Sequence, residues 1–135
     1  MALRGTDELN QLTERIIGAC IEVHRHLGPG LLEKIYEQCL VDELELQGLR
    51  SQQQVAVPIR YKGRELAQGY RLDLVVEGIV IVEVKAVLSL EPVHQAQALT
   101  YLRLSGLPVA LLVNFHTPLL RSGLRRFLNR MNPEQ

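Results

Sequence analysis

The stretch Gly69–Ala86, with the sequence GYRLDLVVEGIVIVEVKA, decides the fold. Two runs rich in Val, Ile and Leu lie on either side of Glu77-Gly78, which predicts two antiparallel strands joined by a hairpin. Charged side chains interrupt these apolar strands, among them Asp73 in the first strand and Glu83 and Lys85 in the second. Burying such groups is costly, so these three residues need a chemical explanation.

The chain on either side of this hairpin predicts further helices and strands. We expect helices at about residues 7–26, 32–48, 92–104 and 122–129, and strands at 54–61, 69–76, 79–86 and 108–115. Three successive strands followed by a helix and a strand predict an antiparallel meander, extended by a strand that returns through a crossover helix. The expected fold class is therefore α/β (α+β), with a mixed central sheet flanked by helices and with extra N-terminal and C-terminal helices.

The composition is typical of one globular domain. The chain has 135 residues, 47% of them hydrophobic and 22% charged, and a chain of this length can bury roughly two-thirds of its unfolded surface. We expect residues 1–135 to form a single domain. Lys plus Arg and Asp plus Glu number 15 each, which argues against a binder that relies on bulk charge. The neutral total is a cancellation, because acids dominate Leu31–Leu46 and arginines dominate Arg121–Arg130.

The apolar stretches and the cysteines indicate a cytoplasmic protein without a membrane partner. The first ten residues contain no apolar run, and the longest apolar stretches are only strand-sized. Cys20 and Cys39 fall on the apolar stripes of two predicted helices, which favours reduced core thiols. A disulfide, or a nucleophilic thiol paired with a histidine, is the alternative.

Two interpretations fit Asp73, Glu83 and Lys85. They form either an ion pair on a solvated sheet face or a divalent-metal site, because Mg²⁺ prefers clustered carboxylate oxygens. A lysine beside such a metal can orient or deprotonate a water molecule for attack on a phosphodiester.

The metal site requires both carboxylates on one face of the hairpin. The numbers of directly opposed residues must then have an even sum, because side chains alternate along each strand. A two-residue turn at Glu77-Gly78 would put the acids on opposite faces. We therefore expect a three-residue loop, Val76–Gly78 with Gly78 left-handed, or a bulge that restores the parity.

Other residues are weaker candidates when taken alone. Glu33 opens a predicted helix and complements the helix dipole there, and Gln97 and Tyr101 lie four residues apart on one helical face. The predicted last helix carries a basic patch, which is either a solvated face or a strip that contacts phosphates. This patch contains Arg121, Arg125, Arg126 and Arg130.

Three segments together resemble a known family. The string Gly30-Leu31-Leu32-Glu33-Lys34-Ile35-Tyr36 resembles the motif of the small bacterial GxxExxY proteins. Asp73 with Glu83-Val84-Lys85 resembles the signature of the PD-(D/E)xK, or restriction-endonuclease-like, nuclease superfamily. The stretch Gln97–Tyr101 resembles the QxxxY motif of RecB-type nucleases in that superfamily. The resemblance runs from about Leu12 to Arg126.

This resemblance implies an αβββαβ core and a metal-dependent nuclease that hydrolyses DNA phosphodiester bonds. The implied cofactor is Mg²⁺ or Mn²⁺, and the implied metal ligands are Glu33, Asp73, Glu83 and the backbone carbonyl of Val84. Lys85 would position the attacking water and stabilise developing charge, and Gln97 and Tyr101 would orient the site or touch the DNA. The expected nucleic-acid contacts are Tyr36, Arg71, Arg121 and Arg125.

A second function class stays open at this point. A non-catalytic module that binds nucleic acid or protein could keep the same fold and pocket. In either class, a homodimer or a partner protein could supply specificity, because a domain of this size has no obvious separate recognition element.

Overall fold

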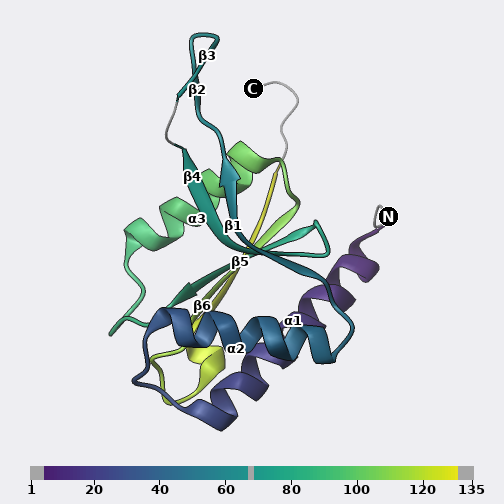
Figure 1. The fold of residues 1–135 in the computed structure, drawn as a ribbon, viewed down its shortest axis with the longest axis vertical. Coiled ribbons are helices and arrows are strands. Elements are labelled where there is room, and N and C mark those ends of the chain that lie inside the picture. The colour runs from purple at the N-terminus through teal and green to yellow at the C-terminus, as the bar shows by residue number, and fades with distance from the viewer. Residues whose placement is uncertain (1–4, 67–68, 131–135) are drawn as a thin grey trace.

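The computed structural model describes residues 5–66 and 69–130. A five-stranded sheet in the order β1-β4-β5-β6-β7 forms its centre, and β2 and β3 form a separate two-stranded sheet (Figure 1). The elements are α1 Thr6–Leu27, α2 Glu33–Leu46, β1 Ser51–Val57, β2 Arg60–Tyr61, β3 Arg64–Glu65, β4 Tyr70–Val76, β5 Val80–Lys85, α3 Pro92–Ser105, β6 Val109–Asn114, the 3-10 helix η1 Leu120–Gly123 and β7 Leu124–Leu128.

The central sheet is mixed. Strands β1, β4 and β5 pair antiparallel as a meander, β6 pairs parallel to β5, and β7 pairs antiparallel to β6. Helix α3 makes the crossover between β5 and β6 and covers one face of the sheet, while α1 and α2 cover the other. This arrangement confirms the predicted mixed α/β fold class and is consistent with a restriction-endonuclease-like fold.

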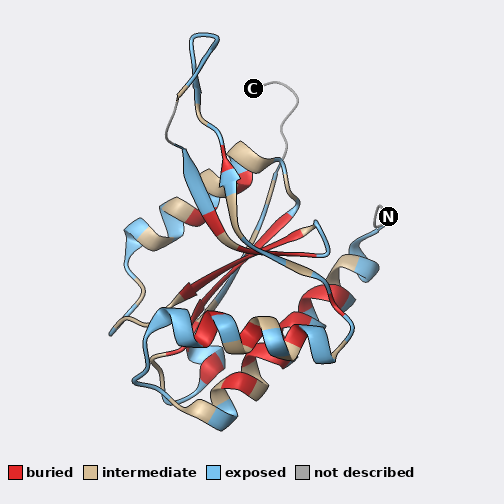
Figure 2. Ribbon diagram, in the orientation of Figure 1, coloured by how far each residue is buried: buried red, intermediate tan, exposed pale blue. Residues whose placement is uncertain are grey.

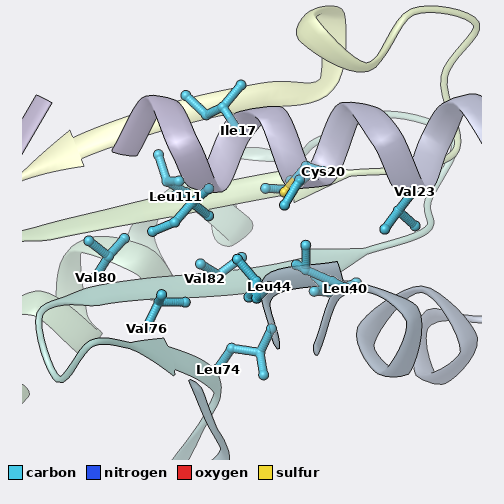
Figure 3. Packing of buried hydrophobic residues seen from close by; sticks show 14 of the residues in the cluster. Ile17, Cys20, Val23, Leu40, Leu44, Leu74, Val76, Val80, Val82 and Leu111 are labelled. Atoms are coloured by element: carbon cyan, nitrogen blue, oxygen red, sulfur yellow. The ribbon is translucent and has the colours of Figure 1, made fainter. Parts of the chain in front are cut away.

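The main core lies between the sheet and the pair α1 and α2. Apolar residues recur along α1 at steps of three and four, and they pack on valines and leucines of the central strands (Figures 2 and 3). Cys20 is buried there and Cys39 is half-buried, and both thiols are free, as predicted. Burial raises the pKa of the Cys20 thiol to about 12, which makes it unreactive. Within the described ranges, no helix is long and apolar enough to cross a membrane.

The predicted C-terminal helix over residues 122–129 is wrong. The chain forms η1 and then the edge strand β7, which satisfies the backbone groups of the buried strand β6. Leu124 packs on the α1 and α2 side of the sheet and Phe127 on the α3 side, which is the alternation of a strand.

The expected single strand over residues 54–61 is also wrong. Strand β1 ends at Val57, directly before Pro58, and a separate hairpin made of β2 and β3 follows. Proline has no N–H to donate to a ladder, so the strand stops there.

Candidate functional site

The hairpin between β4 and β5 has the parity that a shared site requires. Its opposed pairs are Leu74 with Val82, Val75 with Ile81 and Val76 with Val80, and each pair has an even sum. The loop is Glu77–Ile79, one residue later than the predicted Val76–Gly78, and Glu77 and Gly78 have φ values of 55° and 68°. The even parity and the left-handed Gly78 are therefore confirmed, and the same register places Asp73 opposite Glu83.

Strands β4 and β5 separate at this point. The backbone pairing ends at Leu74 and Val82, and side chains of the two acids then bridge the strands. The Val84 amide donates a 2.9 Å hydrogen bond to Oδ2 of Asp73, and the Asp73 amide lies 3.4 Å from Oε1 of Glu83. Both carboxylates therefore lie in the gap between the two strands.

The strand alternation breaks at Asp73. Leu72 packs in the cluster under α3, whereas Leu74 packs under α1 and α2, although residues two apart in a regular strand share a face. In β1, Gln54 lies opposite Asp73 and has a φ of 53°, which is uncommon for a residue other than glycine. The switch of faces in both strands turns the Asp73 side chain toward β5.

A buried carboxylate from α2 supports this switch. Glu37 is 6% exposed, and it accepts hydrogen bonds of 3.0 Å from Gln53 and 3.2 Å from Gln54. This network ties α2 to β1 beside the acids. We did not predict this network from the sequence, although the run of three glutamines, Gln52–Gln54, is a visible signal.

Glu83 is the more buried of the two acids. Its residue is 4% exposed, whereas Asp73 and Lys85 are half-buried. Burial, together with the negative charge of Asp73, raises the pKa of the Glu83 carboxyl to about 9, and the positive charge of Lys85 opposes the rise. Glu83 and Lys85 follow Ile81 at steps of two, so both lie on the α3 side of the sheet.

Tyr101 of α3 faces the two acids. Its ring lies 5.3 Å from the ring of Tyr70 at the start of β4. Burial raises the pKa of the Tyr101 phenol, and the negative charges of Glu83 and Asp73 add to the rise. Gln97 is half-buried one helical turn earlier, and among the described residues it makes no hydrogen bond to the acids.

Glu33 is not part of this group. It lies exposed on the first turn of α2, on the helix layer that covers the other face of the sheet. No group of three or more His, Cys, Asp or Glu side chains that could hold a metal occurs among the described residues. Asp73 and Glu83 therefore come together as a pair, and a role of Glu33 as a metal ligand stays a prediction.

The expected contact of Tyr36 with nucleic acid is wrong. Tyr36 is fully buried and stacks on Phe115, with ring centroids 4.6 Å apart. Its hydroxyl donates to the Gly28 carbonyl at 2.5 Å and accepts from the Leu31 amide at 3.1 Å. Tyr36 therefore fixes the turn between α1 and α2 and has no exposed surface to offer.

The predicted basic patch divides between the two faces of β7. Arg125 of β7 lies opposite Leu112 of β6, and Leu112 lies opposite Glu83 of β5. The three residues form one row across the sheet, so the backbone of Arg125 is two strand spacings, about 9–10 Å, from that of Glu83. Arg121 lies 4.0 Å from Glu14, and Arg126 donates to Asn10, so these two face α1.

A buried asparagine holds the chain that follows Lys85. Asn114 is 1% exposed, its Nδ2 donates to the Val87 carbonyl at 2.9 Å, and its Oδ1 accepts from the Val87 amide at 3.0 Å. The Phe115 amide also donates to the Lys85 carbonyl at 2.9 Å. We did not predict this role of Asn114 from the sequence, although a single polar residue inside an apolar strand could have indicated it.

Comparison with known proteins agrees with this geometry. The family model described as the PD-(D/E)XK nuclease superfamily matches residues 10–127. No curated protein and no solved structure gives a significant match. The matched span contains the paired acids, Lys85 and nearly the whole fold, and the chain therefore belongs to the PD-(D/E)XK nuclease superfamily.

Proposed function

We propose that this protein is a metal-dependent nuclease that hydrolyses DNA phosphodiester bonds at Asp73, Glu83 and Lys85. The observation that supports this most is the convergence of two carboxylates at the point where β4 and β5 separate. Lys85 lies two residues beyond Glu83 on the same sheet face. A surface ion pair would not need Glu83 to be buried.

The donor set fits a hard divalent cation. Two carboxylates lie side by side with one of them buried, and a cation between them would offset their repulsion. Asp73, Glu83 and the backbone carbonyl of Val84 would hold Mg²⁺ or Mn²⁺. When bound, the metal would supply an acidified water and would neutralise charge on the phosphate.

The protein's own residues would divide the remaining work. Lys85 would donate hydrogen bonds from its amine group, which would orient the attacking water and stabilise the developing charge on the phosphate. Tyr101 and Gln97 would orient the substrate from α3. Arg71 and Arg125 would contact backbone phosphates, since both are exposed.

Cleavage assays test this proposal. Plasmid, linear and branched DNA would be incubated with Mg²⁺ or Mn²⁺ and with wild type, Asp73→Ala or Lys85→Ala. We expect nicking or end degradation by wild type only. Asp42→Ala, which removes an exposed acid from α2, is the matched control and should cleave like wild type.

Two results would contradict the proposal. Cleavage that survives both substitutions would mean that another site or another protein is responsible. Metal or DNA binding without any cleavage by wild type would favour the non-catalytic binding module.

A further inference from the structure

A short basic hairpin projects from the body of the protein. We call residues 60–65 the basic arm, which consists of β2, β3 and the turn Lys62-Gly63. Lys62 and Gly63 have φ values of 50° and 79°, as a type I′ turn requires, and this turn matches the natural twist of a two-stranded ribbon. Figure 1 shows the arm extending beyond the sheet and the helices, and every residue of it is exposed.

The charge of the arm is strongly positive for its size. It contains three cations and one acid. Arg60 lies 4.0 Å from Glu65, which leaves Lys62 and Arg64 without an acidic partner in the described part of the chain. The Lys62 ammonium lies 5.4 Å from the centre of the Tyr61 ring. The tip of the arm therefore presents two uncompensated positive charges to solvent.

The base of the arm is fixed relative to the paired acids. The Leu66 amide donates to the Ile59 carbonyl at 2.8 Å. A Cβ atom on Gly69 would lie 2.2 Å from the Val57 carbonyl oxygen, so only glycine allows the two strands to approach here. Tyr70 follows directly and contacts Tyr101 of α3. Glu65, the last residue of the arm, lies eight positions before Asp73 in the chain, and Tyr70 lies three positions before it.

The reach of the arm is limited by its length. Gln54 lies opposite Asp73, and the seven residue-to-residue steps from Gln54 to Tyr61 span about 23 Å when extended. One turn of B-DNA is about 34 Å long. A duplex that runs along the arm and places a phosphodiester at the acids would therefore meet the arm within one helical turn.

We propose that the basic arm binds the phosphate backbone of duplex DNA within one helical turn of the bond presented to Asp73 and Glu83. This inference rests on the proposed function, to which it adds a substrate-binding surface. The major groove admits a two-stranded ribbon, and the charges of Lys62 and Arg64 complement its phosphate walls.

Salt-dependent binding tests this proposal. The affinity for a fluorescent 20-base-pair duplex would be measured by anisotropy between 50 and 200 mM salt, both in EDTA and in Ca²⁺. The slope of log K against log[salt] should fall in magnitude by about 2 in Lys62→Ser/Arg64→Ser, because each lost phosphate contact removes about 0.9 from it. The control Arg25→Ser/Lys34→Ser removes two exposed cations from α1 and α2 and should keep the wild-type slope.

The outcomes separate the arm from the nuclease proposal. An unchanged slope in Lys62→Ser/Arg64→Ser, an equal loss in the control, or no duplex binding by wild type in either condition would overturn the arm proposal. Arm-dependent binding together with no cleavage in Mg²⁺ would support the arm and contradict the nuclease. Cleavage in Mg²⁺ together with binding that does not depend on the arm would support the nuclease and contradict the arm proposal. Circular dichroism spectra that match wild type would exclude misfolding of the variants.

Discussion

The backbone amide of Val84 donates a 2.9 Å hydrogen bond to the carboxylate of Asp73. In an uninterrupted antiparallel pair, a strand amide of this kind bonds a carbonyl of its partner. Here the pairing of β4 with β5 has already ended at Leu74 and Val82, and a side chain replaces the missing carbonyl. The position of the first acid is therefore fixed by the backbone of the strand that carries the second.

The pH dependence of stability should report the burial of Glu83. Its pKa is raised from 4.5 to about 9, so the folded state holds a proton that the unfolded state releases. The stabilisation is complete below pH 4.5 and is lost as the pH rises through about 9. In metal-free buffer, the free energy of unfolding of wild type should fall between pH 5 and pH 9.

Glu83→Gln should flatten this profile, because the amide has no proton to lose. Urea unfolding at pH 5, 7 and 9 checks the expectation, with Glu45→Gln on the exposed surface of α2 as the control that keeps the wild-type profile. Parallel profiles for wild type and Glu83→Gln would show that Glu83 ionises normally.

Metal binding should stabilise the folded protein through the same pair. A ligand present at 100 times its dissociation constant adds about 2.7 kcal/mol to the free energy of unfolding. We expect Mg²⁺ or Mn²⁺ to raise the Tm of wild type and of Asp42→Asn, and to leave the Tm of Asp73→Asn unchanged. Equal metal-induced shifts in all three proteins would place the metal elsewhere.

Tyr36→Phe separates the structural role of Tyr36 from a binding role. The substitution removes the bonds to Gly28 and Leu31 and keeps the stack on Phe115. The free energy of unfolding should fall by about 1–3 kcal/mol, as measured by urea unfolding, while the affinity for duplex DNA stays at the wild-type value. A loss of DNA affinity in a stably folded Tyr36→Phe protein would restore the nucleic-acid contact that burial rules out.

Two glycines test the conformation of the hairpin loop. Gly78 is left-handed and its added Cβ would meet no atom within 4 Å, so Gly78→Ala should cost about 1 kcal/mol of stability through backbone strain alone. Gly18 is an exposed residue of α1 with equally open surroundings. Gly18→Ala should therefore stabilise the protein by about 0.5–1 kcal/mol. If thermal unfolding shows that both substitutions change the stability in the same direction, the left-handed conformation of Gly78 would be contradicted.

The sequence predicted the parts of the site that depend on local periodicity. The even parity of the hairpin could be predicted, because a site shared by Asp73 and Glu83 requires it. The left-handed Gln54 and its bond to Glu37 could not be predicted, since no local pattern specifies a contact between α2 and β1. The C-terminal strand was missed for a similar reason. Apolar and polar residues alternate too weakly over residues 122–129 to indicate a strand. The segment forms β7 because the backbone N–H and C=O groups along the outer edge of β6 need hydrogen-bond partners.

The rate of plasmid nicking by Lys85→Ala tests the central claim most directly. Lys34→Ala, which removes an exposed lysine from α2, is the matched control, and the metal-induced Tm shift of each variant shows whether its metal site is intact. We expect Lys85→Ala to nick supercoiled DNA in Mg²⁺ about 100-fold or more slowly than wild type, and Lys34→Ala to keep the wild-type rate. A Lys85→Ala rate within twofold of wild type would contradict the central claim.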